Sequence, residues 1–163
     1  MSNVKSSSAL YENIVDAYQT ISGAASQNLY QVTGIVKVHY IYGIVEVVIA
    51  ADVTDAYLDL DDAGAQPVLT LVAGAPDISA APVGSYLAKT NTSGVILEYL
   101  SSATCERSEQ VLAAMLSQFV VIQKTGGVAT YIRLSYSGAG ASGKIHWYCK
   151  WEKMSRDATL VAV

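Results

Sequence analysis

The stretch GAGASGK, residues 138–144, is the part of the chain whose spacing comes closest to a known chemistry. Its glycines fit G-x-G-x-x-G, and together with Lys144 they fit most of G-x-x-x-x-G-K; both patterns bind nucleotide phosphates. A phosphate-binding loop needs a following helix, whose free N–H groups hold the phosphate, and a hydroxyl after the lysine for Mg²⁺. Ile145 stands in that position. The stretch therefore predicts a turn rather than a nucleotide site.

The segments on both sides of this turn alternate as strands do. In KIHWYCKWEK, residues 144–153, Trp147 and Cys149 point one way while His146 and Tyr148 point the other. ATYIRLSYS, residues 129–137, alternates in the same manner. Two such strands joined by a glycine-rich segment predict a β-hairpin whose flexible tip is SGAGASG, residues 137–143.

Three other polar features of the chain have residue types that occur in metal or catalytic sites: the acidic run at residues 59–64, His39 and His146. The run DLDDAG, residues 59–64, is similar to the start of a calcium loop, but its twelfth position is Thr70 instead of the chelating glutamate. We favour a solvated strand end that runs into a turn. His39 and His146 lie in separate predicted strands without a ligand at metal spacing, so we interpret both as sheet residues. We predict a protein that is not an enzyme and has no cofactor or metal.

The tyrosines and cysteines leave alternatives open. Eleven tyrosines suit sugar-stacking platforms, but tyrosine is also a favoured half-buried residue of sheets, and we favour the second interpretation. Cys105 and Cys149 are far apart in sequence and form no C-x-x-C pair. We expect both to be reduced, buried thiols rather than a disulfide.

Composition narrows the class of protein. The 163 residues suit one domain, and 52% of them are hydrophobic but only 15% charged, which indicates a neutral surface or one covered by a partner. The net charge is −4 and the ten basic residues are scattered, so nucleic-acid binding is not expected. We find no signal peptide and no apolar run long enough to span a membrane. We expect action in the cytoplasm of the cell that makes the protein, or on a particle assembled there.

The first 28 residues differ from the rest and predict an N-terminal arm. Residues 8–22, SALYENIVDAYQTIS, predict a short amphipathic helix capped by Ser8 and ended by Gly23. A helix this short needs a surface on which to dock. The expected partner-binding residues of the arm are Leu10, Tyr11, Ile14, Tyr18 and Ile21.

Residues 29–163 change to a period of two and predict an all-β domain. About eight strand-like segments separated by turn signals predict an antiparallel β-sandwich or jelly roll. RSEQVLAAMLS, residues 107–117, predicts a short helix between strands. The predicted organisation is thus an N-terminal helical arm, residues 1–28, followed by the β-sandwich domain.

Two segments carry a family resemblance. They are LYQVTGIVKVHYIYGIVEVVI (29–49), read as two strands separated by a break at Gly43, and SGKIHWYCKWEKMSRDATLVAV (142–163), a G-K-I-x-W-x-x-x-W strand with an Ala/Val tail. Both resemble small virion structural proteins of tailed bacteriophages, including capsid decoration (cement) proteins and related head or tail accessory proteins. The chain departs from the family pattern at Trp151, at Lys153 and Met154 where proline is common, and at Arg156 and Asp157.

The resemblance covers about a quarter of the chain. It implies a non-enzymatic, β-rich protein that is often a homotrimer and binds the major capsid protein on the capsid surface of the virion. An alternative is a tail or head-fibre accessory module that binds a receptor glycan. The resemblance implies no catalytic residue.

Overall fold

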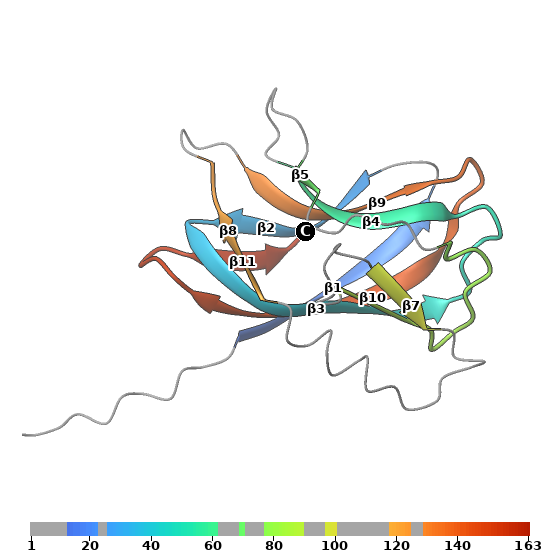
Figure 1. The fold of residues 1–163 in the computed structure, drawn as a ribbon, viewed down its shortest axis with the longest axis horizontal. Coiled ribbons are helices and arrows are strands. Elements are labelled where there is room, and N and C mark those ends of the chain that lie inside the picture. Colours follow the sequence, from blue (N-terminus) through green and yellow to red (C-terminus); the bar gives the residue numbers. More distant parts are fainter. Residues whose placement is uncertain are drawn as a thin grey trace, which may run out of the picture.

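The alternating segments of the chain form antiparallel strands in the computed structural model (Figure 1). The structure describes residues 13–22, 26–61, 69–70, 77–89, 97–100, 118–124 and 129–163. These ranges contain eleven strands and no helix. Neighbouring strands pair antiparallel throughout. The expected all-β, antiparallel fold is confirmed for this part of the chain.

The larger sheet has six strands. Its order is β1-β10-β3-β6-β7, and β8 pairs with the first part of β3. The strands are β1 (Asn13–Ser22), β3 (Ile35–Val47), β6 (Tyr86–Lys89), β7 (Leu97–Leu100), β8 (Phe119–Ile122) and β10 (Ser142–Lys153). The long strands β3 and β10 form its centre.

The smaller sheet has five strands in the order β11-β2-β9-β4-β5. They are β2 (Ser26–Thr33), β4 (Thr54–Asp61), β5 (Leu69–Thr70), β9 (Thr130–Ser137) and β11 (Thr159–Ala162). The C-terminal strand β11 was expected only as an apolar tail. It pairs with β2, which places it at the edge of the sheet.

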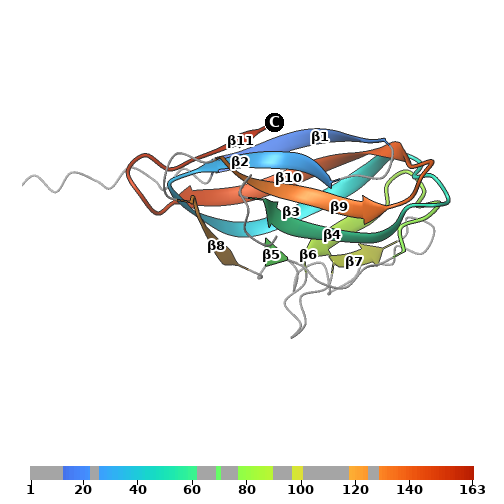
Figure 2. The same cartoon turned by 90° about the horizontal axis from the view of Figure 1, so that it is seen from above.

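The two sheets lie in two layers, as the views in Figures 1 and 2 show. Their inward-facing side chains form one continuous core. On β10 the apolar set that alternation predicts is buried in the core: Ile145, Trp147, Cys149 and Trp151. On β9 the predicted set Thr130, Ile132, Leu134 and Tyr136 is buried as well. Burial of these side chains leaves the alternate residues of both strands on the outer faces of the sheets.

Strand β3 passes through Gly43 without a break, so the predicted break at this residue is wrong. A Cβ atom on Gly43 would lie 2.7 Å from Cγ2 of Ile145 and 3.0 Å from Cδ2 of Trp147. The glycine is therefore required because the Trp147 indole packs directly on the backbone of the neighbouring strand. The chain turns instead at Gly34, whose φ is 68°. This corner joins β2 in one sheet to β3 in the other.

The predicted N-terminal helix is wrong over residues 13–22, which form β1 and pair with β10. A helix would place Ile14, Tyr18 and Ile21 on one face. In the strand, Ile21 is in the core and only 1% exposed, whereas Ile14 and Tyr18 are 61% and 56% exposed on the outer face. Val15, Ala17 and Ile21 also alternate with polar residues, which is the pattern of a strand rather than a helix. The hydrogen bonds that β1 makes with β10 select the strand.

The remaining predictions about segments have mixed outcomes. The boundary placed between residues 28 and 29 falls inside β2, and β1 belongs to the larger sheet. Residues 8–12 of the predicted helix and the predicted helix at 107–117 lie outside the described residues.

The predicted β9–β10 hairpin is also wrong. Strand β9 pairs with β2 and β4, and β10 pairs with β1 and β3, so each strand has two partners in its own sheet. The glycine-rich segment between them crosses from the smaller sheet to the larger one. Gly138 and Gly143 both have φ of 140°, a backbone conformation that side-chain-bearing residues rarely adopt.

Candidate functional site

The outer face of the larger sheet carries a row of aromatic rings drawn from four strands. The pleat of β10 turns His146 and Tyr148 outward, opposite Trp147 and Cys149 in the core. Register places Tyr18 of β1 beside His146, and Tyr42 of β3 beside Tyr148. Tyr86 of β6 completes the row. We call these five residues the aromatic ladder: Tyr86, Tyr42, Tyr148, His146 and Tyr18.

Successive rings of the aromatic ladder contact one another. The Tyr42 ring stacks on the Tyr86 ring with 5.3 Å between their centroids. It also stacks on the Tyr148 ring, with 4.9 Å between the centroids. Tyr148 and His146 lie 4.2 Å apart, and His146 stacks on Tyr18 at 3.8 Å. Aromatic pairs of this kind, three of which join neighbouring strands, stabilise a sheet by about 0.5–1.5 kcal/mol each beyond the burial of their area. The ladder therefore fixes the ring positions on this face.

His146 is the polar centre of the ladder. Its Nε2 lies 3.1 Å from Oδ2 of Asp16, and its Nδ1 lies 2.9 Å from the Tyr148 hydroxyl. Oε1 of Glu46 lies 3.4 Å from the same Nδ1. The side chain is only 10% exposed, so these contacts replace most of its solvation. The arrangement can hold or accept a proton at Nδ1.

The charged side chains on this face are arranged as ion pairs. Glu152 lies 3.3 Å from both Lys37 and His39, and Lys144 lies 3.1 Å from Glu46. The hydrogen bond from Lys37 lowers the pKa of Glu152 below its ordinary value. Lys144 also lies over the Tyr18 ring, 4.6 Å from its centroid. Because these cations face acidic partners or rings, the described part of this face does not form the basic patch that nucleic-acid binding requires.

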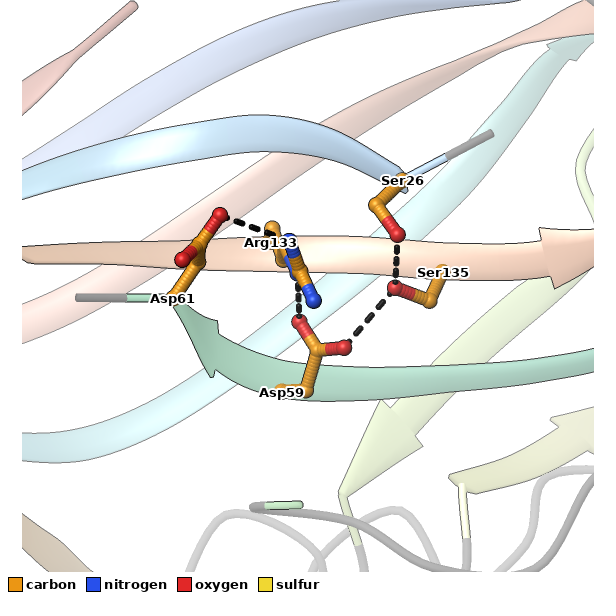
Figure 3. A network of polar contacts seen from close by, with 5 residues as sticks. All are labelled: Ser26, Asp59, Asp61, Arg133 and Ser135. Carbon is orange, nitrogen blue, oxygen red and sulfur yellow. Dashed lines mark hydrogen bonds and ion pairs between the residues drawn. The ribbon is translucent and has the colours of Figure 1, made fainter. Parts of the chain in front are cut away.

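A second polar network lies on the outer face of the smaller sheet (Figure 3). The Nε of Arg133 donates to Oδ1 of Asp59 at 2.5 Å, and its Nη1 donates to Oδ2 of Asp61 at 2.7 Å. Ser135 lies 2.8 Å from the other oxygen of Asp59 and 2.7 Å from the Ser26 hydroxyl. Burial alone lowers the pKa of Arg133, but its hydrogen bond and ion pair with Asp59 raise it overall. The network joins β4, β9 and β2.

This network corrects the interpretation of the acidic run at residues 59–64. Asp59 was expected to be solvated, yet it is fully buried, and its carboxylate contacts Arg133 and Ser135. Sequence alternation could not indicate this, because the partner lies 74 residues away in the chain. Residues 62–64 lie outside the described residues. Within the described ranges, no group of three or more His, Cys, Asp or Glu side chains could hold a metal ion.

The crossover at residues 138–144 lacks the features that a phosphate-binding loop needs. The Gly140 N–H donates to Oδ2 of Asp52 at 2.6 Å, so a carboxylate of the protein itself occupies the position of an anion. Strand β10, not a helix, follows the glycines. The side chain of Lys144 is directed to Glu46 and Tyr18. An added phosphate would therefore have to displace Asp52.

The five predicted partner-binding residues are placed differently. Ile14 and Tyr18 lie exposed on the outer face of β1, and Tyr18 is the end of the aromatic ladder. Ile21 packs in the core. Leu10 and Tyr11 lie outside the described residues. The structure thus brings two of the predicted residues onto the aromatic face, although as part of a strand.

Sequence reasoning missed the aromatic ladder itself. The outward alternation of His146 and Tyr148 was visible, but the register that places Tyr18 and Tyr42 beside them was not. Cys149 is a free, buried thiol, as expected, and burial raises its pKa. Cys105 lies outside the described residues. Among the described residues, no helix is long and apolar enough to cross a membrane.

The aromatic face thus combines a row of stacked rings, a histidine with polar contacts at both ring nitrogens, and the exposed side chains of Ile14 and Tyr18. Comparisons of the chain with protein-family models, with curated proteins and with solved structures find no match.

Proposed function

We propose that the protein is a non-enzymatic structural protein of a tailed-bacteriophage virion. In this proposal it is a capsid decoration (cement) protein that binds the major capsid protein lattice and stabilises the head. It acts as a homotrimer on the capsid surface after synthesis in the host cytoplasm. The resemblance of segments 29–49 and 142–163 to small phage virion proteins supports the proposal, as does the low share of charged residues, 15%. We further infer a β-sandwich from the two sheets, and the jelly-roll alternative stays a prediction.

The observation that carries the proposal is the exposed apolar edge of the aromatic face. Ile14 and Tyr18 are 61% and 56% exposed and point the same way from β1, about 13 Å apart along the strand. Tyrosine and aliphatic side chains surrounded by paired charges are typical of the centre and rim of protein interfaces. Exposed apolar and aromatic side chains aligned on one strand favour a contact with another macromolecule.

Binding to phage heads that lack the protein tests this proposal. The double variant Ile14→Ser/Tyr18→Ser should reduce co-sedimentation with heads at least tenfold, because each buried apolar side chain contributes about 1.5–3 kcal/mol. Val161→Ser on β11 is the matched control, since Val161 is a similarly exposed apolar residue of the smaller sheet. Unchanged binding of the double variant would show that the aromatic face is not the surface that binds the capsid. Deleting residues 1–28 is a poorer test, because it removes β1 from the larger sheet.

A second candidate is a tail or head-fibre accessory module that binds a receptor glycan. The observation in its favour is the exposed ring of Tyr18 beside the carboxylate of Asp16, since sugars stack on aromatic rings and hydrogen-bond to carboxylates. The other tyrosines argue less for it, because Tyr42 is stacked between Tyr86 and Tyr148. Glycan-array binding that is lost in Tyr18→Ala and retained in Tyr18→Phe would favour this candidate over capsid binding.

A further inference from the structure

The hydrogen bonds of His146 define which of its nitrogens carries the proton. The Asp16 carboxylate can only accept, so the Nε2 facing it carries the hydrogen. Nδ1 faces the Tyr148 hydroxyl at 2.9 Å and, farther away, Oε1 of Glu46 at 3.4 Å. In the neutral tautomer with hydrogen on Nε2, the lone pair of Nδ1 accepts the hydrogen bond that Tyr148 donates. Carboxylate, imidazole and phenol thus form one chain of hydrogen bonds across β1 and β10.

Each ring nitrogen of His146 faces an acceptor that an imidazolium could use. An imidazolium would donate from Nε2 to Asp16 and from Nδ1 toward Oε1 of Glu46, which lies 3.4 Å away. Lys144, at 3.1 Å from the other oxygen of Glu46, offsets part of that charge. A second proton on Nδ1 would therefore lie beside a carboxylate oxygen, as the hydrogen on Nε2 already does. His146 is therefore positioned to take the phenol proton of Tyr148.

The phenol does not lose this proton spontaneously. Partial desolvation, followed by Tyr18, Glu46 and Asp16, raises the pKa of Tyr148, so the hydroxyl stays protonated at neutral pH and is no standing nucleophile. Loss of an electron from a phenol makes its O–H strongly acidic. An adjacent base that accepts the proton at the same time avoids a high-energy phenol radical cation. Tyr30 and Tyr136 differ, because their hydroxyls contact a backbone carbonyl and a backbone N–H, neither of which can take a proton.

We propose that Tyr148 is the preferred site of one-electron oxidation among the described tyrosines, with His146 as the proton acceptor. An external one-electron oxidant, such as a photogenerated ruthenium(III) complex, takes one electron from the phenol. The O–H bond of Tyr148 breaks and an N–H bond forms at Nδ1 of His146. The products are a neutral tyrosyl radical, an imidazolium between Asp16 and Glu46, and the reduced oxidant. The proposal does not depend on a role in the virion.

The stacking of the ladder gives this radical a route to the surface. Tyr18 stacks on His146 at 3.8 Å and is 56% exposed. When Tyr18 transfers an electron to the Tyr148 radical, Tyr148 regains its proton from His146 and Tyr18 releases its own to water. Two Tyr18 radicals on two molecules can then form a carbon–carbon bond. Dityrosine formation in total removes two electrons and two protons, which the oxidant and water take up.

Brief photo-oxidation with a ruthenium trisbipyridine complex and persulfate tests the proposal. Peptide mass spectrometry at low light dose should locate the largest share of oxidation, dityrosine included, at Tyr148 and Tyr18. His146→Phe keeps a stacked ring but cannot accept a proton. Its oxidation at these two residues should fall about tenfold, the equivalent of about 1.4 kcal/mol for one lost hydrogen bond. Tyr131→Phe, on the outer face of β9, is the control and should leave the yield unchanged.

Two further measurements keep the test decisive if His146→Phe folds poorly. Asp16→Asn changes an exposed side chain, and it should lower the oxidation of Tyr148 because the imidazolium loses a carboxylate partner. Oxidation of the native protein in D₂O should be slower at Tyr148, since a proton moves in the same step. Equal oxidation of Tyr148 and Tyr131 in the native protein would overturn the proposal, as would an undiminished yield in His146→Phe or Asp16→Asn.

Discussion

His146 stacks on Tyr18 with 3.8 Å between the ring centroids, although the two residues lie on different strands and 128 positions apart in the sequence. This contact links the edge strand β1 to the centre of the larger sheet. It makes the exposed ring of Tyr18 part of a rigid surface, because the ring is held by a histidine that is itself fixed by Asp16 and Tyr148. A rigid aromatic edge loses little entropy when it binds a partner.

Replacing Gly43 by alanine tests the packing of Trp147 on β3. The added methyl would lie 2.7 Å from Cγ2 of Ile145 and 3.0 Å from the Trp147 ring. Overpacking of this kind should destabilise the protein by about 1–3 kcal/mol, measured as the free energy of unfolding in urea. Ser142→Ala, at the exposed start of β10, is the control. A stability equal to that of the native protein would show that the core has room at this point.

The ion pair of Arg133 with Asp59 should be essential to the smaller sheet. Asp59→Ala leaves the mostly buried guanidinium without its main partner, and a loss of about 3–5 kcal/mol of stability is expected. Asp61→Ala removes the half-buried partner and should cost distinctly less. Equal effects of the two substitutions in chemical denaturation would contradict the unequal roles that burial assigns to the carboxylates.

The thiol of Cys149 should be unreactive in the folded protein. Burial raises its pKa, so the thiolate that reacts with iodoacetamide is scarce, and the sulfur is shielded by the core. Mass spectrometry should find Cys149 alkylated only after unfolding in urea. Alkylation at the same rate with and without urea would mean that the core opens readily around β10.

Acid should weaken the contact between β3 and β10 through Glu152. Its pKa is lowered in the folded state, chiefly by the hydrogen bond from Lys37, below the ordinary value of 4.5. A lowered carboxyl pKa stabilises the fold above the ordinary value, and this contribution is lost as the pH falls through the folded value. The urea midpoint of Glu152→Gln should therefore change less than that of the native protein between about pH 6 and pH 3. If the urea midpoints of Glu152→Gln and the native protein fell equally with pH, Glu152 would make no such contribution.

The crossover at residues 138–144 should not bind nucleotides. Asp52 holds the Gly140 N–H, and its negative charge would repel a phosphate at that position. Titration calorimetry with ATP and with NAD should give no binding heat. Measurable binding that Lys144→Ala abolishes would contradict this prediction.

Local patterns in the sequence predicted where the strands lie in the chain, but they did not predict which strands pair with one another. The alternation of Ile132 and Leu134 on β9, and of Trp147 and Cys149 on β10, placed the correct residues in the core. The same patterns could not tell that β9 and β10 lie in different sheets, because alternation reports the burial of a strand and not its neighbours. The aromatic ladder was hidden for the same reason, since register between distant strands creates it.

The predicted break at Gly43 and the predicted N-terminal helix are wrong because each local pattern is compatible with more than one structure. A glycine between two strand-like segments predicts a break at Gly43, but the missing side chain leaves room for the indole of Trp147. Ile14, Tyr18 and Ile21 have helical spacing, and only pairing with β10 decides that the segment is a strand. Long-range packing overrides local preference in both places.

A cryo-electron microscopy reconstruction of phage heads saturated with the protein tests the central claim most directly. We expect three copies around a local threefold position, with the outer face of the larger sheet against the major capsid protein and Ile14 and Tyr18 in the contact. Heads that show no bound protein, or a bound protein whose aromatic face points to solvent, would contradict the account.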